Sequence, residues 1–226
     1  MRSSLQLFVF LGVSVVGMSA QDAYRVGKQD QTIIHESAWL RVRRVQYQPG
    51  ESVSMHEHKQ RVVVFLTDGV VRSLAPDGKT TDAPFHRGLV NWSEPVKHAL
   101  QNVGKSPLIA VEAELLGPHP PGAQAFIGDP LKQDPDHFRV EFENDSVRVL
   151  RFTLGPLERS PMHDQRDRIT IRLSEMHSRT TFPDGKTEER RGDRDVAEWH
   201  DSARHTLENL DKDRYDSISI EFKSPQ

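Results

Sequence analysis

The sequence predicts an all-β protein that contains two copies of one structural unit. Three observations support this fold class. Short segments alternate apolar and polar residues, as strands with one buried face do. Asp-Gly pairs, which favour tight hairpin turns, occur at 77–78 and 184–185. A shift of 107 residues aligns the two halves of the chain without a gap and carries His56 onto His163.

The internal repeat covers most of the chain. The segment that starts at Trp39, WLRVRRVQYQPGESVSMHEH, aligns with SVRVLRFTLGPLERSPMHDQ, which starts at Ser146. Further along, PDGKT occurs at 76–80 and again at 183–187. We therefore predict two units, residues 33–117 and 138–223. The intervening residues 118–137 are rich in Pro and Gly and have no periodicity, so they are expected to form a linker.

Each unit is expected to have an opening strand, a hairpin in its middle and a closing strand. The opening strands are WLRVRRVQYQP (39–49) and SVRVLRFTLGP (146–156), which alternate and are rich in Val, Leu and aromatic residues. In the first unit, 61–83 predicts two strands and a hairpin turn. The closing strands are SPLIAVEAELL (106–116) and YDSISIEFK (215–223). Several short strands with turn signals between them are typical of a sandwich or barrel.

The first 20 residues have the pattern of a secretory signal peptide. A start with one Arg is followed by the uncharged segment LFVFLGVSVVGM and then by small residues that end at Ala20. The apolar run is shorter than the roughly 20 residues that a membrane span needs, although an uncleaved anchor is the alternative. We expect cleavage after Ala20 and export to the periplasm or the medium, with no membrane attachment afterwards.

Composition excludes several kinds of function. The net charge is −3, which does not favour a nucleic-acid-binding protein. The chain has no cysteine, so disulfides, thiol nucleophiles and thiolate ligands are all absent. Any protein-bound metal must therefore be held by nitrogen and oxygen ligands.

Three histidines of the first unit form a candidate metal site. His56 and His58 are one residue apart, so on a strand they point to the same face. His98 lies 42 residues beyond His56, a spacing that His163 and His205 repeat in the second unit. If this face lines a barrel, three imidazoles would suit one divalent ion such as Fe, Mn, Zn, Ni or Cu. The alternative is a metal-free barrel with hydrogen-bonded core histidines.

Two of these segments resemble the cupin motifs. Gly50-x5-His56-x-His58 resembles the first motif, with a Gly at its usual end (Gly69), and His98-x3-Asn102 resembles the second. The double copy is similar to a bicupin over nearly the whole mature chain. The resemblance implies two tandem jelly-roll β-barrels and a metal ion bound inside the first barrel by His56, His58 and His98.

The sequence departs from the cupin pattern at two places. The family usually has a glutamate four or five residues after the second His, where this chain has Val62 and Val63. The first site would thus be a three-histidine site. In the second unit the pair becomes His163-x-Gln165, so His163, Gln165 and His205 would form a second, weaker site. We expect this second site to be degenerate.

The predicted function follows from the three-histidine site. Three neutral ligands leave the charge of a divalent ion uncompensated, which favours an anionic ligand in the open positions. We expect an exported bicupin that acts on a small anionic molecule by oxygenation, isomerisation or hydrolysis. The alternatives are a non-catalytic protein that binds a small ligand or metal, and a structural or partner-binding role.

The strand after the histidine pair indicates which outer face of the first unit is covered by another part of the protein. We expect Val62 and Val64 to face inward with the histidines, and Val63 and Phe65 to form an apolar outer face. Such a face should pack against the second unit or against another subunit, as in a homodimer. The matching outer face of the second unit, Thr170 and Arg172, should be exposed to water.

The remaining polar and aromatic residues in the repeat are expected to be structural. We predict that Trp92 and Trp199 are core anchors and that Asn102 and Asn209 satisfy backbone groups in turns. Six histidines without a repeat partner are expected on the surface: His35, His86, His119, His137, His177 and His200.

Overall fold

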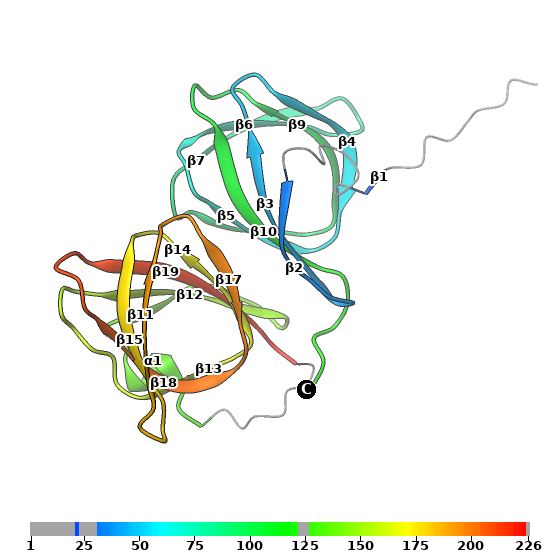
Figure 1. Cartoon of the computed structure of the whole chain (residues 1–226). Helices are drawn as coiled ribbons and strands as arrows, with labels where there is room; N and C mark the ends of the chain where they lie inside the picture. The colour runs from blue at the N-terminus through cyan, green and yellow to red at the C-terminus, as the bar shows by residue number, and fades with distance from the viewer. Residues whose placement is uncertain (1–20, 23–30, 122–126, 225–226) are drawn as a thin grey trace, which may run out of the picture.

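The computed structural model describes residues 21–22, 31–121 and 127–224, and the predicted signal peptide at 1–20 lies outside the described residues. The described chain is built almost entirely from β-strands that close into two barrels (Figure 1). No helix in the described ranges is long and apolar enough to cross a membrane.

The first barrel consists of two five-stranded sheets. One sheet has the order β2-β3-β10-β5-β8 and the other β1-β4-β9-β6-β7. The strands of the first sheet are β2 (Gln31–Glu36), β3 (Leu40–Tyr47), β10 (Leu108–Leu115), β5 (Arg61–Phe65) and β8 (Val90–Ser93). Those of the second are β1 (Gln21–Asp22), β4 (Ser52–His58), β9 (Val96–Asn102), β6 (Gly69–Leu74) and β7 (Thr80–Phe85).

The second barrel repeats this architecture. Its sheets have the orders β11-β12-β19-β14-β17 and β13-β18-β15-β16. The first contains β11 (Phe138–Glu143), β12 (Val147–Leu154), β19 (Tyr215–Phe222), β14 (Arg168–Arg172) and β17 (Ala197–His200). The second contains β13 (His163–Gln165), β18 (Ala203–Asn209), β15 (Met176–Thr181) and β16 (Thr187–Gly192). The helix α1 (Pro130–Gln133) lies in the segment that was predicted to be a linker.

Equivalent turns close the two barrels in the same way. Asn102 donates from Nδ2 to the carbonyls of Tyr47 and Ser106, and its Oδ1 accepts from the backbone N–H of Gly104. Asn209 makes the corresponding contacts with Gly155 and with other backbone groups of its own barrel. The prediction that these two asparagines satisfy backbone groups in turns is therefore confirmed.

The inward and outward faces of β5 are the reverse of those predicted. Val62 and Val64 point out of the barrel, whereas Val63 packs inside it with Val45, Phe85 and other residues of the barrel interior. The expectation failed because β4 and β5 lie in different sheets. Alternation holds within a strand, but it does not carry across the corner between two sheets.

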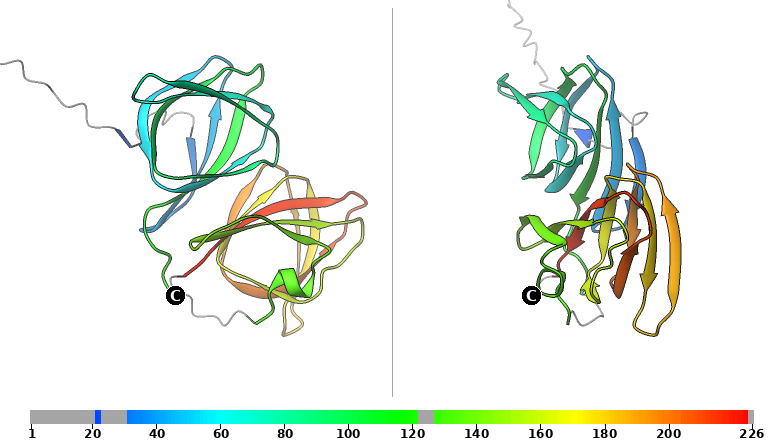
Figure 2. Two further views of the ribbon diagram at one scale, coloured as in Figure 1. Left: turned by 180° about the vertical axis from the view of Figure 1, so that it is seen from behind. Right: turned by 90° about the vertical axis from the view of Figure 1, so that its left-hand side faces the viewer.

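The outward faces of the sheets β2-β3-β10-β5-β8 and β11-β12-β19-β14-β17 pack against each other (Figure 2). Val62 and Val64 of the first barrel share one apolar core with Ile169 and Ile171 of the second, and all four are fully buried. The prediction that the outer sheet of the first unit packs against the second unit is confirmed. The prediction that the second unit presents a wet outer face is wrong, because Thr170 and Arg172 point into its barrel and line its cavity.

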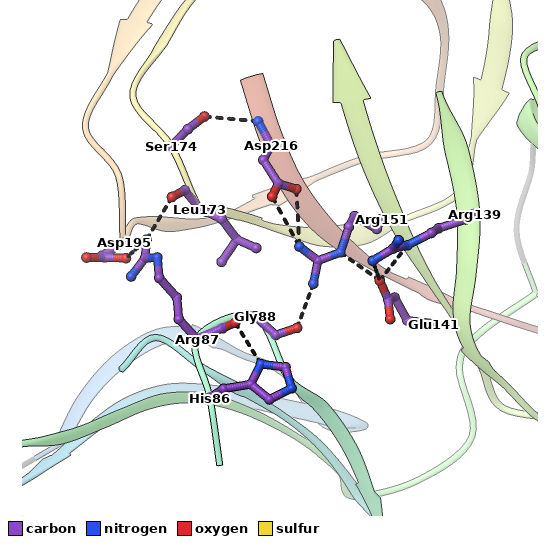
Figure 3. Close-up of polar contacts among 10 residues, drawn as sticks. All are labelled: His86, Arg87, Gly88, Arg139, Glu141, Arg151, Leu173, Ser174, Asp195 and Asp216. Atoms are coloured by element: carbon purple, nitrogen blue, oxygen red, sulfur yellow. Dashed lines mark hydrogen bonds and ion pairs between the residues drawn. The ribbon is translucent and has the colours of Figure 1, made fainter. Parts of the chain in front are cut away.

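Polar contacts border this shared core (Figure 3). Arg87 of the first barrel donates to the carbonyl of Leu173 and forms an ion pair with Asp195. Arg151 of the second barrel donates to the carbonyl of Gly88 at 2.7 Å. Gly88 has φ of +77°, and a Cβ there would lie 2.9 Å from Arg151 Nη2, so glycine suits both the turn and the close approach.

Candidate metal centre

Strands β4 and β9 bring the three predicted ligands of the first barrel together. His56 lies directly opposite His98 in the antiparallel register, and His58 follows on the same face of β4. The side chains point into the barrel and are buried, with 2%, 5% and 7% of the surface of His56, His58 and His98 exposed. One ring nitrogen from each histidine lies within 4.8 Å of the others. The predicted three-histidine cluster is thus present.

The Nδ1 atom of each histidine ring lies within polar contact distance of another group of the protein. His56 Nδ1 lies 2.7 Å from the carbonyl oxygen of Ser54, and His98 Nδ1 lies 3.2 Å from Ser73 Oγ. His58 Nδ1 lies 3.4 Å from the carboxylate of Glu114 and 3.2 Å from the guanidinium of Arg43. Because a carbonyl can only accept, the proton of His56 is on Nδ1 and its lone pair is on Nε2.

The Nε2 atoms face one another. His56 Nε2 and His58 Nε2 are 3.0 Å apart, and His98 Nε2 is buried with no hydrogen-bond partner in the described part of the chain. The guanidinium of Arg43 can only donate, so it favours the tautomer in which His58 Nδ1 accepts and His58 Nε2 donates to His56. The carboxylate of Glu114 favours the opposite tautomer, in which His58 Nε2 carries a lone pair. In that tautomer the lone pairs of His56 and His58 converge in a buried space and repel each other, and a cation relieves that repulsion. These residues therefore fit a metal ion with imidazole ligands.

Burial disfavours the charged form of His56 and His98. It lowers the pKa of His98 to about 3, with smaller contributions from the positive charge of Arg61 and from His56. The pKa of His56 is lowered for the same first reason. Imidazoles bind metals in the neutral form, so the protons that would compete with a metal are already disfavoured at neutral pH.

Two arginines and two glutamates surround the histidines. Arg43 forms a buried ion pair with Glu112 at 2.6 Å. Burial alone would raise the pKa of Glu112, but the charges of Arg43 and Arg61 outweigh it and lower the pKa to about 2. Burial raises the pKa of Glu114, whose carboxylate accepts from the backbone N–H of Lys59. The two positive charges of the arginines balance the two negative charges of the glutamates. A divalent ion would therefore give this interior a net positive charge.

Sequence reasoning missed these four charged residues. Glu112 and Glu114 alternate with Val111 and Ala113 on β10, and all four are buried. Carboxylates that alternate with small apolar residues in a closing strand are the signal that could have identified them, because buried charges need partners. Of the two positions where the cupin pattern has its glutamate, Val62 points away from the barrel interior and Val63 packs inside it.

The second barrel brings together fewer ligands. His163 lies opposite His205 in the register, with ring centroids 4.9 Å apart, and Gln165 follows on the same strand. Among the described residues, the three histidines of the first barrel are the one group of three metal-ligating His, Asp or Glu side chains this close together. Metal binding by His163, Gln165 and His205 stays a prediction.

Two histidines that were expected on the surface lie elsewhere. His200 lines the cavity of the second barrel, and burial lowers its pKa to about 4. His119 is mostly buried, with Trp39 against the edge of its ring and Phe222 stacked on its face. Neither residue aligns with a histidine in the other unit, so the repeat could not predict that these two side chains are buried.

No model of a known protein family matches this sequence, and no curated protein matches it. Solved structures do match its fold. AerE from Microcystis aeruginosa is 13% identical, with a TM-score of 0.59 over 85% of this chain and 96% of AerE. A cupin 2 conserved barrel domain protein from Leptotrichia buccalis is 9% identical, with a TM-score of 0.55 over 91% of this chain and 92% of that protein.

Oxalate decarboxylase from Bacillus subtilis, a protein with Mn(II) centres, is also similar. It is 12% identical, with a TM-score of 0.58 over 87% of this chain and 72% of that enzyme. At such low identities, the similarity concerns the fold and carries no residue roles. Together with the two barrels and the histidine cluster, it shows that the chain has the two-barrel fold of the bicupins.

Proposed function

We propose that the first barrel binds one divalent metal ion through His56, His58 and His98. The observation that carries this proposal is the convergence of three buried imidazoles, of which His98 presents an Nε2 with no partner in the described chain. The nitrogen ligands suit Fe, Mn, Zn, Ni or Cu, and they do not choose among these metals.

We further propose that the site acts on a small anionic molecule. A bound metal ion would supply Lewis acidity and open coordination positions for such a molecule. Arg61 would bind its negative charge, because this guanidinium is 5% exposed and its Nε and Nη1 atoms have no hydrogen-bond partner among the described residues. Buried guanidinium groups without partners are costly, and a carboxylate or enolate would satisfy both atoms.

The reaction classes that fit are oxygenation, isomerisation and hydrolysis. The fold alone does not select one, since cupin barrels with similar architecture host different chemistries. Two of the similar structures are an oxalate decarboxylase and a salicylate 1,2-dioxygenase. Oxalate and salicylate, after which these two enzymes are named, are small carboxylates. This agrees with an anionic substrate for the present chain.

Metal analysis of protein purified without a His tag tests the proposal. We expect about one equivalent of metal per chain in the wild type and a loss of that metal in His98→Ala. His205→Ala is the matched control, because it changes the equivalent histidine of the second barrel, and it should keep the metal. A wild type without metal, or an unchanged content in His98→Ala, would contradict the proposal.

A non-catalytic binding protein is the second candidate. It is favoured by one observation: the carboxylates near the histidines, Glu112 and Glu114, are both held by other groups of the protein. Turnover of diketones, thiols, phenolics and sugar acids by the metal-loaded protein separates the two. Metal binding and ligand binding without any turnover would identify a binding protein.

A structural or partner-binding role and a homodimer were alternatives that an apolar outer face supported. That face is covered by the second barrel. The outer face of the first barrel therefore gives no reason to expect a second subunit.

Export is proposed from the sequence of residues 1–20 alone. We expect the mature protein to begin at Gln21 and to be found in the periplasm or the medium. Intact-mass measurement of the purified native protein tests this proposal. Recovery of the uncleaved chain in the membrane fraction would support an anchor instead.

A further inference from the structure

The second barrel encloses a cavity of about 230 Å³. Its walls come from both sheets, and they combine the degenerate histidine site with side chains of β14 and β19. Most of the lining residues are polar, and they include Arg168, His205 and the hydroxyl residues Thr170, Ser217 and Ser219. The volume lies below the roughly 300–1,000 Å³ of pockets for drug-sized ligands, so the cavity suits a compact polar molecule.

Arg168 is the cation of this cavity that lacks a carboxylate partner. Its side chain is buried, its Nε has no hydrogen-bond partner among the described residues, and its Nη1 donates only to the backbone carbonyls of Arg166 and Asp201. Nearby carboxylates are engaged elsewhere. Glu221 pairs with Arg148 at 2.7 Å.

The other charged groups that line the cavity have partners or contact water. Arg172 pairs with Glu198 at 2.7 Å. The carboxylate of Asp201 accepts from the indole of Trp199 at 2.9 Å, and Asp201 is exposed. Glu188 pairs with Arg190 and with Lys186. The unsatisfied positive charge therefore lies at Arg168.

We propose that this cavity binds a small hydroxylated carboxylate without a metal ion. The carboxylate would accept hydrogen bonds from Arg168, and the hydroxyl groups of the ligand would meet Thr170, Ser217 and Ser219. A guanidinium and a carboxylate form the charge-assisted pair that satisfies a buried arginine. A metal ion fits less well here, because only two imidazoles and an amide are available beside a fixed positive charge.

This inference is independent of the metal site in the first barrel. It concerns a different cavity, and it requires no metal. The test therefore uses full-length protein from which metal has been removed with a chelator, so that failure of one proposal does not affect the other.

Calorimetric titration with gluconate and malate tests the inference, with sorbitol as the uncharged counterpart of gluconate. We expect at least one of the acids to bind with a stoichiometry near one and to raise the melting temperature, and sorbitol to do neither. Arg168→Met should weaken binding at least tenfold. Arg139→Gln removes a charge from an exposed position of the same barrel and should leave binding unchanged.

Arg168→Lys is the second variant in case Arg168→Met does not fold. It keeps the charge but loses the forked donor, so we expect weaker binding in a folded protein. Arg61→Met changes the buried arginine of the first barrel and shows in which barrel the carboxylate binds. It should leave binding in the second barrel intact. The inference is overturned if neither acid binds, if sorbitol binds as well as gluconate, or if binding depends on Arg61 and not on Arg168.

Discussion

Each clustered histidine has one ring nitrogen held by the protein and the other facing its neighbours. Ser54, Ser73 and Glu114 lie beside the Nδ1 atoms of His56, His98 and His58. Groups that hold the distal ring nitrogen fix the tautomer and the orientation of a metal-binding imidazole. The affinity of the site should therefore depend on residues that never touch the metal.

Glu114→Gln tests this dependence. Glu114 favours the His58 tautomer with a free Nε2, whereas Arg43 favours the other tautomer. An amide is a weaker acceptor than a carboxylate, so Glu114→Gln should shift His58 away from the tautomer with a free Nε2. We expect metal affinity to fall about 10- to 100-fold, measured by competition with a chelator. Glu57→Gln is the control, because Glu57 lies on the exposed face of β4, next to His58. An affinity for Glu114→Gln equal to that of the wild type would argue against the assigned role.

The pKa of His98 predicts how the metal-free protein responds to acid. The folded pKa is about 3, whereas the unfolded value is about 6.5. Below pH 6.5 the unfolded chain therefore takes up a proton that the folded chain refuses, and stability falls as the pH drops toward 3. Between pH 7 and pH 4 this histidine should cost on the order of 3 kcal/mol of unfolding free energy.

Urea unfolding of metal-free wild type and His98→Gln, at pH 7 and pH 4, measures this contribution. Glutamine does not titrate, so the variant should lose less stability than the wild type over the same interval. Equal losses in both proteins would show that His98 does not have a depressed pKa. The comparison is needed because other buried histidines, such as His163 and His205, also have lowered pKa values.

At the scale of elements, hydrogen bonds from one side chain close each barrel. Asn102 makes three such contacts and is 1% exposed. Asn102→Ala leaves two backbone carbonyls and one N–H without that partner in a buried turn, so we expect a loss of about 2–4 kcal/mol in unfolding free energy. Urea denaturation measures it, with Asn91→Ala at an exposed position as the control. A loss no larger than that of the control would contradict the structural role.

Much of the element structure could be predicted from the sequence because it depends on local patterns. Alternation identified the long strands, and Asp-Gly identified the hairpins, whose glycines Gly78 and Gly185 have φ of +85° and +83°. The repeat transferred each of these conclusions to the second unit. The three histidines were also predictable, because His56 and His58 lie on one face of a strand and the 42-residue spacing from His56 to His98 recurs in the second unit.

What could not be predicted depends on how sheets meet. Whether the Val62 side chain points into or out of the barrel depends on which sheet β5 joins. The residues next to Val62 in the sequence do not contain that information. The roles of Arg61 and Glu112 depend on contacts across the barrel, between residues far apart in the chain. The sequence therefore identified the candidate ligand residues, and the structure was needed to find the charges around them.

At the scale of the whole molecule, the two barrels share one apolar core. Residues such as Val64, Val111, Ile171 and Ile220 are fully buried in it. Neither barrel alone would keep this surface away from water. We therefore expect the metal-free protein to unfold in one cooperative transition, and calorimetry should show a single peak. Two separate peaks would mean that the interface contributes little.

Ile171→Ala measures the strength of this interface. A buried isoleucine truncated to alanine typically costs about 2–5 kcal/mol, and the loss should appear in the common transition. Ile127→Ala is the control, because Ile127 is 79% exposed and its truncation should have little effect. If Ile171→Ala destabilised only part of the molecule, the shared core would not couple the barrels.

The central claim is that three imidazoles in the first barrel hold a single metal ion. Titration of metal-free protein with Co(II), followed by its visible absorption, tests this claim most directly, because the spectrum reports the coordination of the ion. We predict a sharp endpoint at one equivalent in the wild type and in His205→Ala, and no such spectrum in His98→Ala. A wild type that gives no saturable spectrum, or a His98→Ala variant that gives the wild-type spectrum, would contradict it.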